Sequence, residues 1–99
     1  MAHQVVLAPR ARRDLIQLYD YLEQRAGARV AQSYIDRLDA LFDRLAQFPG
    51  IGAPRPELGP MIRSSGVWPY VVLYRTSDTA IIVLRVVHGR RNITADILK

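Results

Sequence analysis

Residues 80–87 read AIIVLRVV, an apolar run that contains a single arginine. A short run this rich in isoleucine and valine predicts a β-strand. Residues 70–75, YVVLYR, predict a second strand, and Ser77-Asp78-Thr79 between the two predicts a hairpin turn. Both runs are apolar on both faces, so we expect the middle of the sheet to be covered on both sides.

The arginine in this run, Arg85, is the residue that most needs a partner. Side chains alternate between the faces of a strand, which predicts two sets: Ile82, Leu84, Val86 and His88 on one face, and Ile81, Val83, Arg85 and Val87 on the other. A buried guanidinium needs an acidic or carbonyl partner. Two interpretations stay open, one in which Arg85 pairs with a helix carboxylate and one in which it lines an anion-binding groove.

Two amphipathic helices are predicted upstream of these strands. After a short strand at residues 4–8, Pro9 suits the start of a helix that should end near residue 26, because Gly27 accepts left-handed backbone. The second helix is expected over residues 29–48, and so short a link makes the two an antiparallel hairpin. Apolar residues recur every three or four positions in both helices: Ala11, Leu15, Leu18, Leu22 and Ala26, then Val30, Tyr34, Leu38, Leu41, Leu45 and Phe48.

Residues 49–60 hold four of the six prolines and three of the six glycines, which predicts a loop. A weak strand follows at residues 61–67, interrupted by Ser64-Ser65-Gly66, which we interpret as turn residues. The order of elements therefore predicts one α+β domain over residues 1–99. It consists of a strand, an antiparallel two-helix hairpin and a three-stranded antiparallel meander.

The charge balance is basic and rests almost wholly on arginine. The 99 residues carry 14 Lys+Arg against 9 Asp+Glu, a net charge of +5, and Lys99 is the sole lysine. Residues 51–99 hold seven of these cations against three acids, so the C-terminal half suits an anionic partner. The absence of cysteine excludes a disulfide scaffold, a thiolate metal site and a cysteine nucleophile.

Hydropathy and the first residues predict a cytoplasmic chain with no membrane partner. No apolar run approaches the ~18 residues of a membrane span. Residues 1–4, MAHQ, lack the charged-then-apolar layout of a signal peptide.

Few residues suggest catalysis. Zinc, nucleotide and dinucleotide motifs are missing, so we expect no metal and no cofactor. His88 closes the predicted last strand, and two roles stay open for it. Its ring either bonds to nearby carbonyls or donates a proton beside Arg90 and Arg91. Arg63, in the first strand of the meander, adds a further cation from a neighbouring strand.

Other polar and aromatic residues are expected to carry structure. His3 and Glu57 are interpreted as inert surface groups. Trp68 and Tyr70 flank Pro69, a spacing that allows stacking on nucleic-acid bases, but we expect both rings to lie in the core.

Four segments, in order, resemble a known family. Leu7 to Leu15 has a strand followed by Ala11-x-x-Asp14-Leu15, and Pro49-x-x-Gly52 with Arg55 follows the second helix. Tyr70-x-Val72-x-Tyr74 matches a penultimate strand. Residues 82–92, which end in His88-Gly89-Arg90-Arg91-Asn92, match a last strand and tail. Together they resemble the ParE branch of the RelE/ParE superfamily of type II toxin–antitoxin modules, over about residues 4–92.

The resemblance implies a fold, a partner and a target. The fold is the arrangement predicted above. Members are small basic toxins neutralised by a cognate antitoxin, often a ParD-like ribbon-helix-helix protein, within a hetero-oligomer. ParE-like toxins poison DNA gyrase, and RelE-like toxins cut mRNA in the ribosome.

Three candidate functions follow from the residues and the resemblance. In the first, the chain binds gyrase without chemistry of its own through Arg63, Arg85, Arg90 and Arg91, and meets nucleic acid only indirectly. In the second, it is a ribosome-dependent endoribonuclease in which Arg63, Arg85 and His88 act as catalytic residues. The lysines of the RNase branch are missing, which favours gyrase. The third alternative is an enzyme with an uncharged substrate, or a generic interaction module, whose basic end confers only solubility.

Overall fold

The computed structural model describes residues 2–99, so Met1, the first residue of the N-terminal segment considered above, lies outside the described residues. The chain opens with β1 (Gln4–Leu7) and the helices α1 (Pro9–Ala26) and α2 (Ala28–Gln47). The strands β2 (Ala53–Pro54), β3 (Ile62–Val67), β4 (Tyr70–Thr76) and β5 (Ala80–His88) follow. Two short 3-10 helices complete it: η1 (Pro56–Leu58) after β2 and η2 (Ala95–Leu98) after β5.

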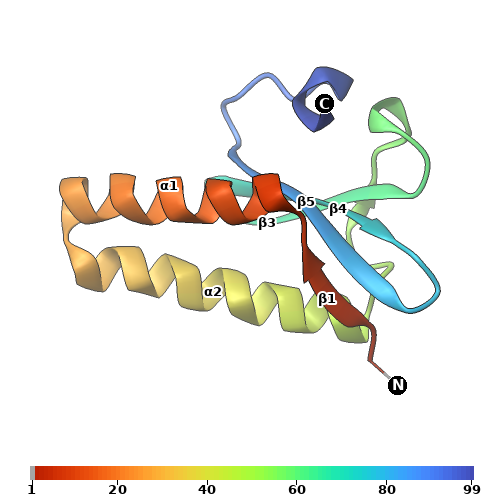
Figure 1. Ribbon diagram of the computed structural model, residues 1–99, viewed down its shortest axis with the longest axis horizontal. Helices are drawn as coiled ribbons and strands as arrows, with labels where there is room; N and C mark the ends of the chain where they lie inside the picture. Colours follow the sequence, from red (N-terminus) through yellow and green to blue (C-terminus); the bar gives the residue numbers. More distant parts are fainter. Residues whose placement is uncertain (1) are drawn as a thin grey trace.

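The strands form one five-stranded sheet in the order β1-β5-β4-β3-β2 (Figure 1). The predicted α+β class and the antiparallel meander β3-β4-β5 are confirmed. Two features go beyond the prediction. β1 lies parallel to β5, with Val5 opposite Ile81, and forms one edge of the sheet. The two-residue β2 pairs with β3 inside the predicted loop.

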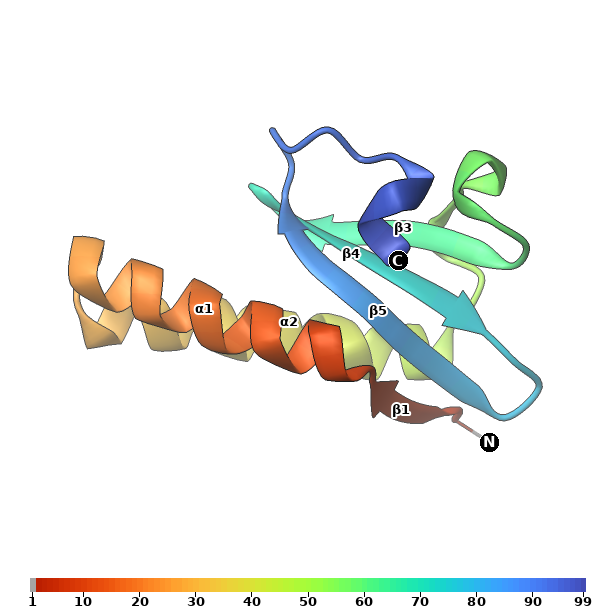
Figure 2. The same ribbon diagram turned by 45° about the horizontal axis from the view of Figure 1, so that its top comes forward.

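Both helices lie against one face of the sheet, and the part of the hairpin around Gly27 extends beyond it (Figures 1 and 2). Gly27 has φ +93°, a backbone that favours glycine, and its N–H donates to the Glu23 carbonyl to close α1. The two ends of the stripe predicted for the second helix are not core: Val30 is 37% and Phe48 58% exposed. Among residues 2–99, no helix combines the length and the hydropathy needed to cross a membrane.

The sheet has a core on each face, as expected from strands that are apolar on both sides. The larger core lies between the helices and the sheet and contains Leu38, Leu45, Val72, Tyr74 and Ile81. The smaller core lies under η1 and η2 and contains Leu58, Ile62, Leu73, Val87 and Ile97. The C-terminal tail therefore covers the face that the helices leave open.

A β-bulge overturns the predicted faces of β5. Leu73 pairs with Arg85 but Tyr74 pairs with Val83, so Leu84 is an extra residue opposite β4. The bulge exchanges the faces of all later residues. As a result, Val86 joins Ile81 and Val83 in the helix-side core. The predicted alternation placed Val87 there instead, but Val87 lies in the smaller core on the other face.

Ser64 and Ser65 are also strand residues rather than turn residues, paired with Leu73 and Val72 in β3. The preceding loop is held by Tyr74 of β4. The buried Tyr74 hydroxyl accepts the Gly52 N–H at 3.0 Å and donates to the Pro49 carbonyl at 2.9 Å. Burial raises the pKa of Tyr74, so the hydroxyl remains a donor near neutral pH.

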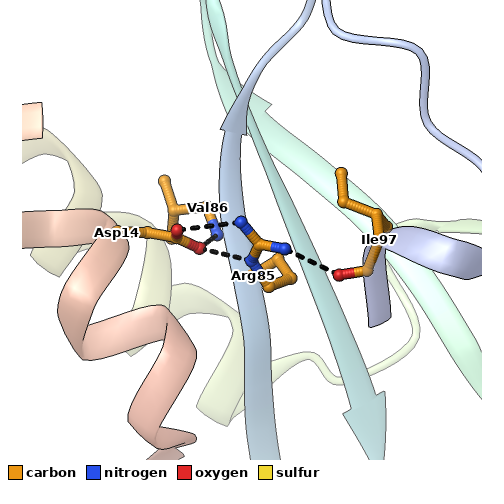
Figure 3. Close-up of polar contacts among 4 residues, drawn as sticks. All are labelled: Asp14, Arg85, Val86 and Ile97. Carbon is orange, nitrogen blue, oxygen red and sulfur yellow. Dashed lines mark hydrogen bonds and ion pairs between the residues drawn. The ribbon is translucent and has the colours of Figure 1, made fainter. Parts of the chain in front are cut away.

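Beyond the end of β1, Asp14 of α1 lies beside β5 and contacts Arg85 and Val86 (Figure 3). The last β1 residue, Leu7, lies opposite Val83, and three residues later the Val86 N–H donates to Asp14 Oδ2 at 2.9 Å. The same carboxylate accepts two bonds from Arg85, at 2.8 Å from Nε and 3.0 Å from Nη2. Arg85 Nη1 donates to the Ile97 carbonyl at 2.7 Å. One ion pair thus joins α1, β5 and the C-terminal tail.

We predict that Tyr74→Phe lowers the free energy of unfolding by about 1–3 kcal/mol, because it leaves the Gly52 N–H and the Pro49 carbonyl without their partner. Urea denaturation measures this. Tyr21→Phe is the matched control, since Tyr21 is 53% exposed, and it should change stability by less than about 0.5 kcal/mol. Equal effects would contradict the role of the Tyr74 hydroxyl.

Asp14→Ala should cost about 3–5 kcal/mol, because it leaves the Arg85 guanidinium buried without its counter-ion. The control is Asp96→Ala, which breaks an ion pair with Lys99 whose side chains are 83% and 80% exposed. That change should cost less than about 1 kcal/mol. A small loss in Asp14→Ala, similar to that in the control, would show that the buried pair does not hold the fold.

Candidate functional site

The C-terminal end of β5 forms one side of a groove of about 280 Å³. Because β1 stops opposite Val83, the rest of this strand edge faces α1. The lining side chains come from α1, β4, β5 and the tail: Asp14, Gln17, Leu18, Tyr21, Tyr70, Val86, Val87, His88 and Arg91. Two predicted site residues, His88 and Arg91, therefore share one concave surface.

The backbone after β5 folds back on His88. Its Nδ1 accepts the Arg90 N–H at 3.1 Å, and its carbonyl accepts the Arg91 N–H at 2.9 Å. The ring is thus bonded to a backbone amide rather than to the carbonyls we expected. All three side chains are exposed, so this turn presents two guanidinium groups and an imidazole to solvent.

Tyr70 forms the floor beside His88. The two rings meet edge to face with centroids 5.8 Å apart, and Tyr34 of α2 packs on Tyr70 in the same way at 5.6 Å. Burial, then the neighbouring Tyr34 and Tyr21, raises the pKa of Tyr70. Its phenol therefore stays protonated at neutral pH and offers the groove a hydroxyl rather than a charge.

The other two predicted site residues lie elsewhere. Arg85 is 4% exposed and paired with Asp14, so the interpretation in which it pairs with a helix carboxylate is correct. Arg63 Nη1 donates to the Gly50 and Gly52 carbonyls, at 3.2 and 2.8 Å. Both guanidinium groups are engaged in holding the chain together. The four arginines do not form one surface, and only Arg90 and Arg91 are exposed side by side.

Tyr70 and Trp68, the two aromatic residues at the β3–β4 turn, differ in burial. Tyr70 is 8% exposed and lies in the core as expected. Trp68 is 79% exposed, so its predicted place in the core is wrong. The reason is the turn itself: Val67 pairs with Tyr70, which leaves Trp68 and Pro69 as the two residues outside the ladder.

The two groups interpreted as inert make local contacts. His3 Nε2 lies 3.1 Å from the Ser77 carbonyl, which ties the start of β1 to the β4–β5 turn. Glu57 is 59% exposed at its side chain and pairs with Arg55 at 3.2 Å.

Asp14, Gln17 and Tyr21 line the groove, and sequence reasoning did not select them. Asp14 carried a signal, because it lies between Ala11 and Leu18 on the apolar stripe of α1, where a carboxylate needs a cation. Gln17 and Tyr21 lie one and two turns further along the helix, and nothing in the sequence marked them as groove residues.

A second groove, of about 630 Å³, lies between β1 and α2 and contains none of the predicted residues. Asp39 and Asp43 line it, and desolvation together with Asp36 and Asp43 raises the pKa of Asp39. Within residues 2–99, no three His, Asp or Glu side chains gather in a group suited to a metal ion.

Comparison with known proteins gives the family. The sequence model described as "ParE toxin of type II toxin-antitoxin system, parDE" matches residues 5–93. The chain is 34% identical over 86 residues to Toxin ParE3 of Caulobacter vibrioides, covering 87% of this chain and 86% of that toxin.

Two solved structures are similar in fold. The first is described as a chromosomal ParDE toxin–antitoxin system from P. aeruginosa. It has a TM-score of 0.74 at 24% identity, over 88% of this chain and 96% of that one. The second is the toxin–antitoxin complex RelBE2 from Mycobacterium tuberculosis. It has a TM-score of 0.64 at 29% identity, over 89% of this chain and 99% of that one. The match of the family model over residues 5–93 and the 34% identity to Toxin ParE3 show that the chain belongs to the ParE toxin family of type II toxin–antitoxin systems.

Proposed function

We propose that this ParE-family toxin inhibits growth by binding DNA gyrase, without chemistry of its own, and that a ParD-like ribbon-helix-helix antitoxin neutralises it. The observation that carries the binding mechanism is the burial of Arg85 against Asp14. A ribonuclease would need cations that reach the scissile phosphate together with an acid and a base. Here Arg85 donates to Asp14 and Ile97, and Nη1 of Arg63 donates to two loop carbonyls. Both arginines that the ribonuclease hypothesis places with His88 are therefore engaged within the fold.

An antitoxin segment has a surface to cover on the helical hairpin. Large apolar side chains are exposed along the two helices, with Ile16 of α1 at 62% and Val30 of α2 at 37%. An acidic-apolar segment that folds on binding can wrap such a surface, with a helix in a groove and a tail along a sheet edge. The similar P. aeruginosa structure is described as a ParDE system, which supports this kind of partner.

The second candidate function, ribosome-dependent cleavage of mRNA, keeps one supporting observation. His88 is exposed and shares the groove of about 280 Å³ with Arg91, so a proton donor and a cation do face the same space. The likeness to the RelBE2 complex also agrees with this branch of the superfamily.

One experiment separates the two functions. Purified toxin is added to a DNA supercoiling reaction with gyrase and, in parallel, to a translating ribosome extract. We expect loss of supercoiling with mRNA left intact. Cleavage of mRNA in phase with codons, with normal supercoiling, would replace the proposed function by the ribonuclease.

The double change Arg90→Glu, Arg91→Glu should sharply weaken growth inhibition, because it reverses the exposed charge at the end of the sheet. It should cost little stability, about 0–1 kcal/mol for each exposed charge. Growth after induction is measured alongside copurification with the antitoxin, which should be unchanged. The control is Arg10→Glu, Arg12→Glu, an equal reversal at exposed positions of α1. If the tail variant is folded and still as toxic as the wild type, these arginines do not face the target.

His88→Gln should keep most of the toxicity, because glutamine can still accept the Arg90 N–H. Loss of a general acid would instead lower the rate about 10²–10⁴-fold. Growth inhibition by the variant, with its fold checked by circular dichroism, decides between them. Loss of toxicity in a folded variant would favour the ribonuclease.

A further inference from the structure

Trp68 is the most exposed large apolar residue among those described, at 79%. It does not contribute to either core, and it does not line the grooves described above. A tryptophan is costly to leave in water, since burying an aromatic side chain is worth about 1.5–3 kcal/mol. The position therefore suggests a partner that covers the indole.

The indole is carried by a fixed part of the backbone. Trp68 and Pro69 form a two-residue turn between paired strand residues, Val67 and Tyr70. The Pro69 carbonyl accepts the Gly89 N–H at 2.7 Å, which fastens the turn to the start of the tail. A Cβ at Gly89 would lie 3.1 Å from that carbonyl and 3.6 Å from the indole, so glycine allows the close approach.

Cations lie directly beside this turn. Tyr70 is paired with His88, so the β3–β4 turn and the residues that follow β5 lie at the same end of the sheet (Figure 2). Those residues are Gly89 under the indole and then the exposed Arg90 and Arg91. The end of the sheet thus combines a projecting tryptophan with an adjacent pair of guanidinium groups.

We propose that Trp68 is the anchor by which the toxin docks on its target, a folded protein with an apolar pocket in an acidic surface. This inference deepens the proposed function by naming the contact and the chemistry of the target surface. Tryptophan and arginine are the residues most enriched among interface positions that carry binding energy. The indole fills the pocket, and Arg90 and Arg91 meet the acidic rim.

The shape of this surface favours a folded protein as the partner over an extended antitoxin segment or a single-stranded nucleic acid. A side chain that projects from a tight turn needs a preformed cavity in its partner, which an extended antitoxin segment lacks. Single-stranded nucleic acid is bound where stacking rings lie along a positively charged groove. The groove next to Trp68 is lined mostly by uncharged residues, among them Leu18, Tyr21 and Val86, with Asp14 in its wall, and Arg91 is the one arginine or lysine among the described residues that lines it.

The test compares Trp68→Ala, Trp68→Phe and a matched control, Phe48→Ala. Phe48 is a second exposed aromatic residue, at 58%, and lies in the segment that follows α2. Each variant is expressed with the antitoxin, purified as the complex to confirm folding, and then assayed for growth inhibition and for affinity to gyrase. Trp68→Ala should weaken target affinity about 30-fold or more and relieve growth inhibition. Trp68→Phe should retain much of the affinity, and Phe48→Ala should behave like the wild type.

The two readouts separate this inference from the proposed function. Growth inhibition equal to the wild type in Trp68→Ala overturns the anchor, whatever the target is. Loss of growth inhibition in Trp68→Ala, when the wild type fails to bind gyrase, supports the anchor and overturns gyrase as the target. If Trp68→Ala instead loses affinity for the antitoxin, or for a labelled single-stranded oligonucleotide that the wild type binds, the anchor on a folded target is wrong.

Discussion

The buried pair of Asp14 and Arg85 satisfies the part of the β5 edge that β1 leaves uncovered. A four-residue β1 cannot cover a nine-residue β5, so β5 has no strand neighbour on that side beyond Val83. Asp14 replaces the missing strand at this point, because its carboxylate accepts the Val86 N–H as a carbonyl of a neighbouring strand would. The buried carboxylate in turn requires a cation, and Arg85 extends from it to the Ile97 carbonyl, which docks the tail.

This constraint decides which arginines are free to act outside the molecule. Arg85 and Arg63 lie in strands and donate to Asp14, to Ile97 and to the loop carbonyls of Gly50 and Gly52. Arg90 and Arg91 come after the last strand, where the backbone turns on His88 and both side chains remain exposed. The four arginines that the sequence singled out thus divide into two that hold the fold together and two that are exposed at one end of the sheet.

Local sequence signals were enough for the helices, because Pro9, Gly27 and the apolar spacing act within one turn of chain. They failed where a contact between distant residues decided the outcome. The bulge at Leu84 depends on the register against β4, and alternation alone could not place Val86 on the helix side. The partner of Arg85 lies 71 residues away, so its type was predictable but its identity was not. Trp68 looked like a core residue because hydropathy carries no information about a turn that projects its side chain.

From these contacts we infer that Arg85 serves the fold and not the target. The double variant Asp14→Asn, Arg85→Gln tests it directly, since the amides can keep an acceptor for the Val86 N–H and a hydrogen bond between the two side chains without any guanidinium. Growth inhibition is measured for the variant after urea denaturation confirms a cooperative fold. The account predicts toxicity close to that of the wild type. A folded, non-toxic double variant would contradict it, and would place Arg85 among the groups that act on the target.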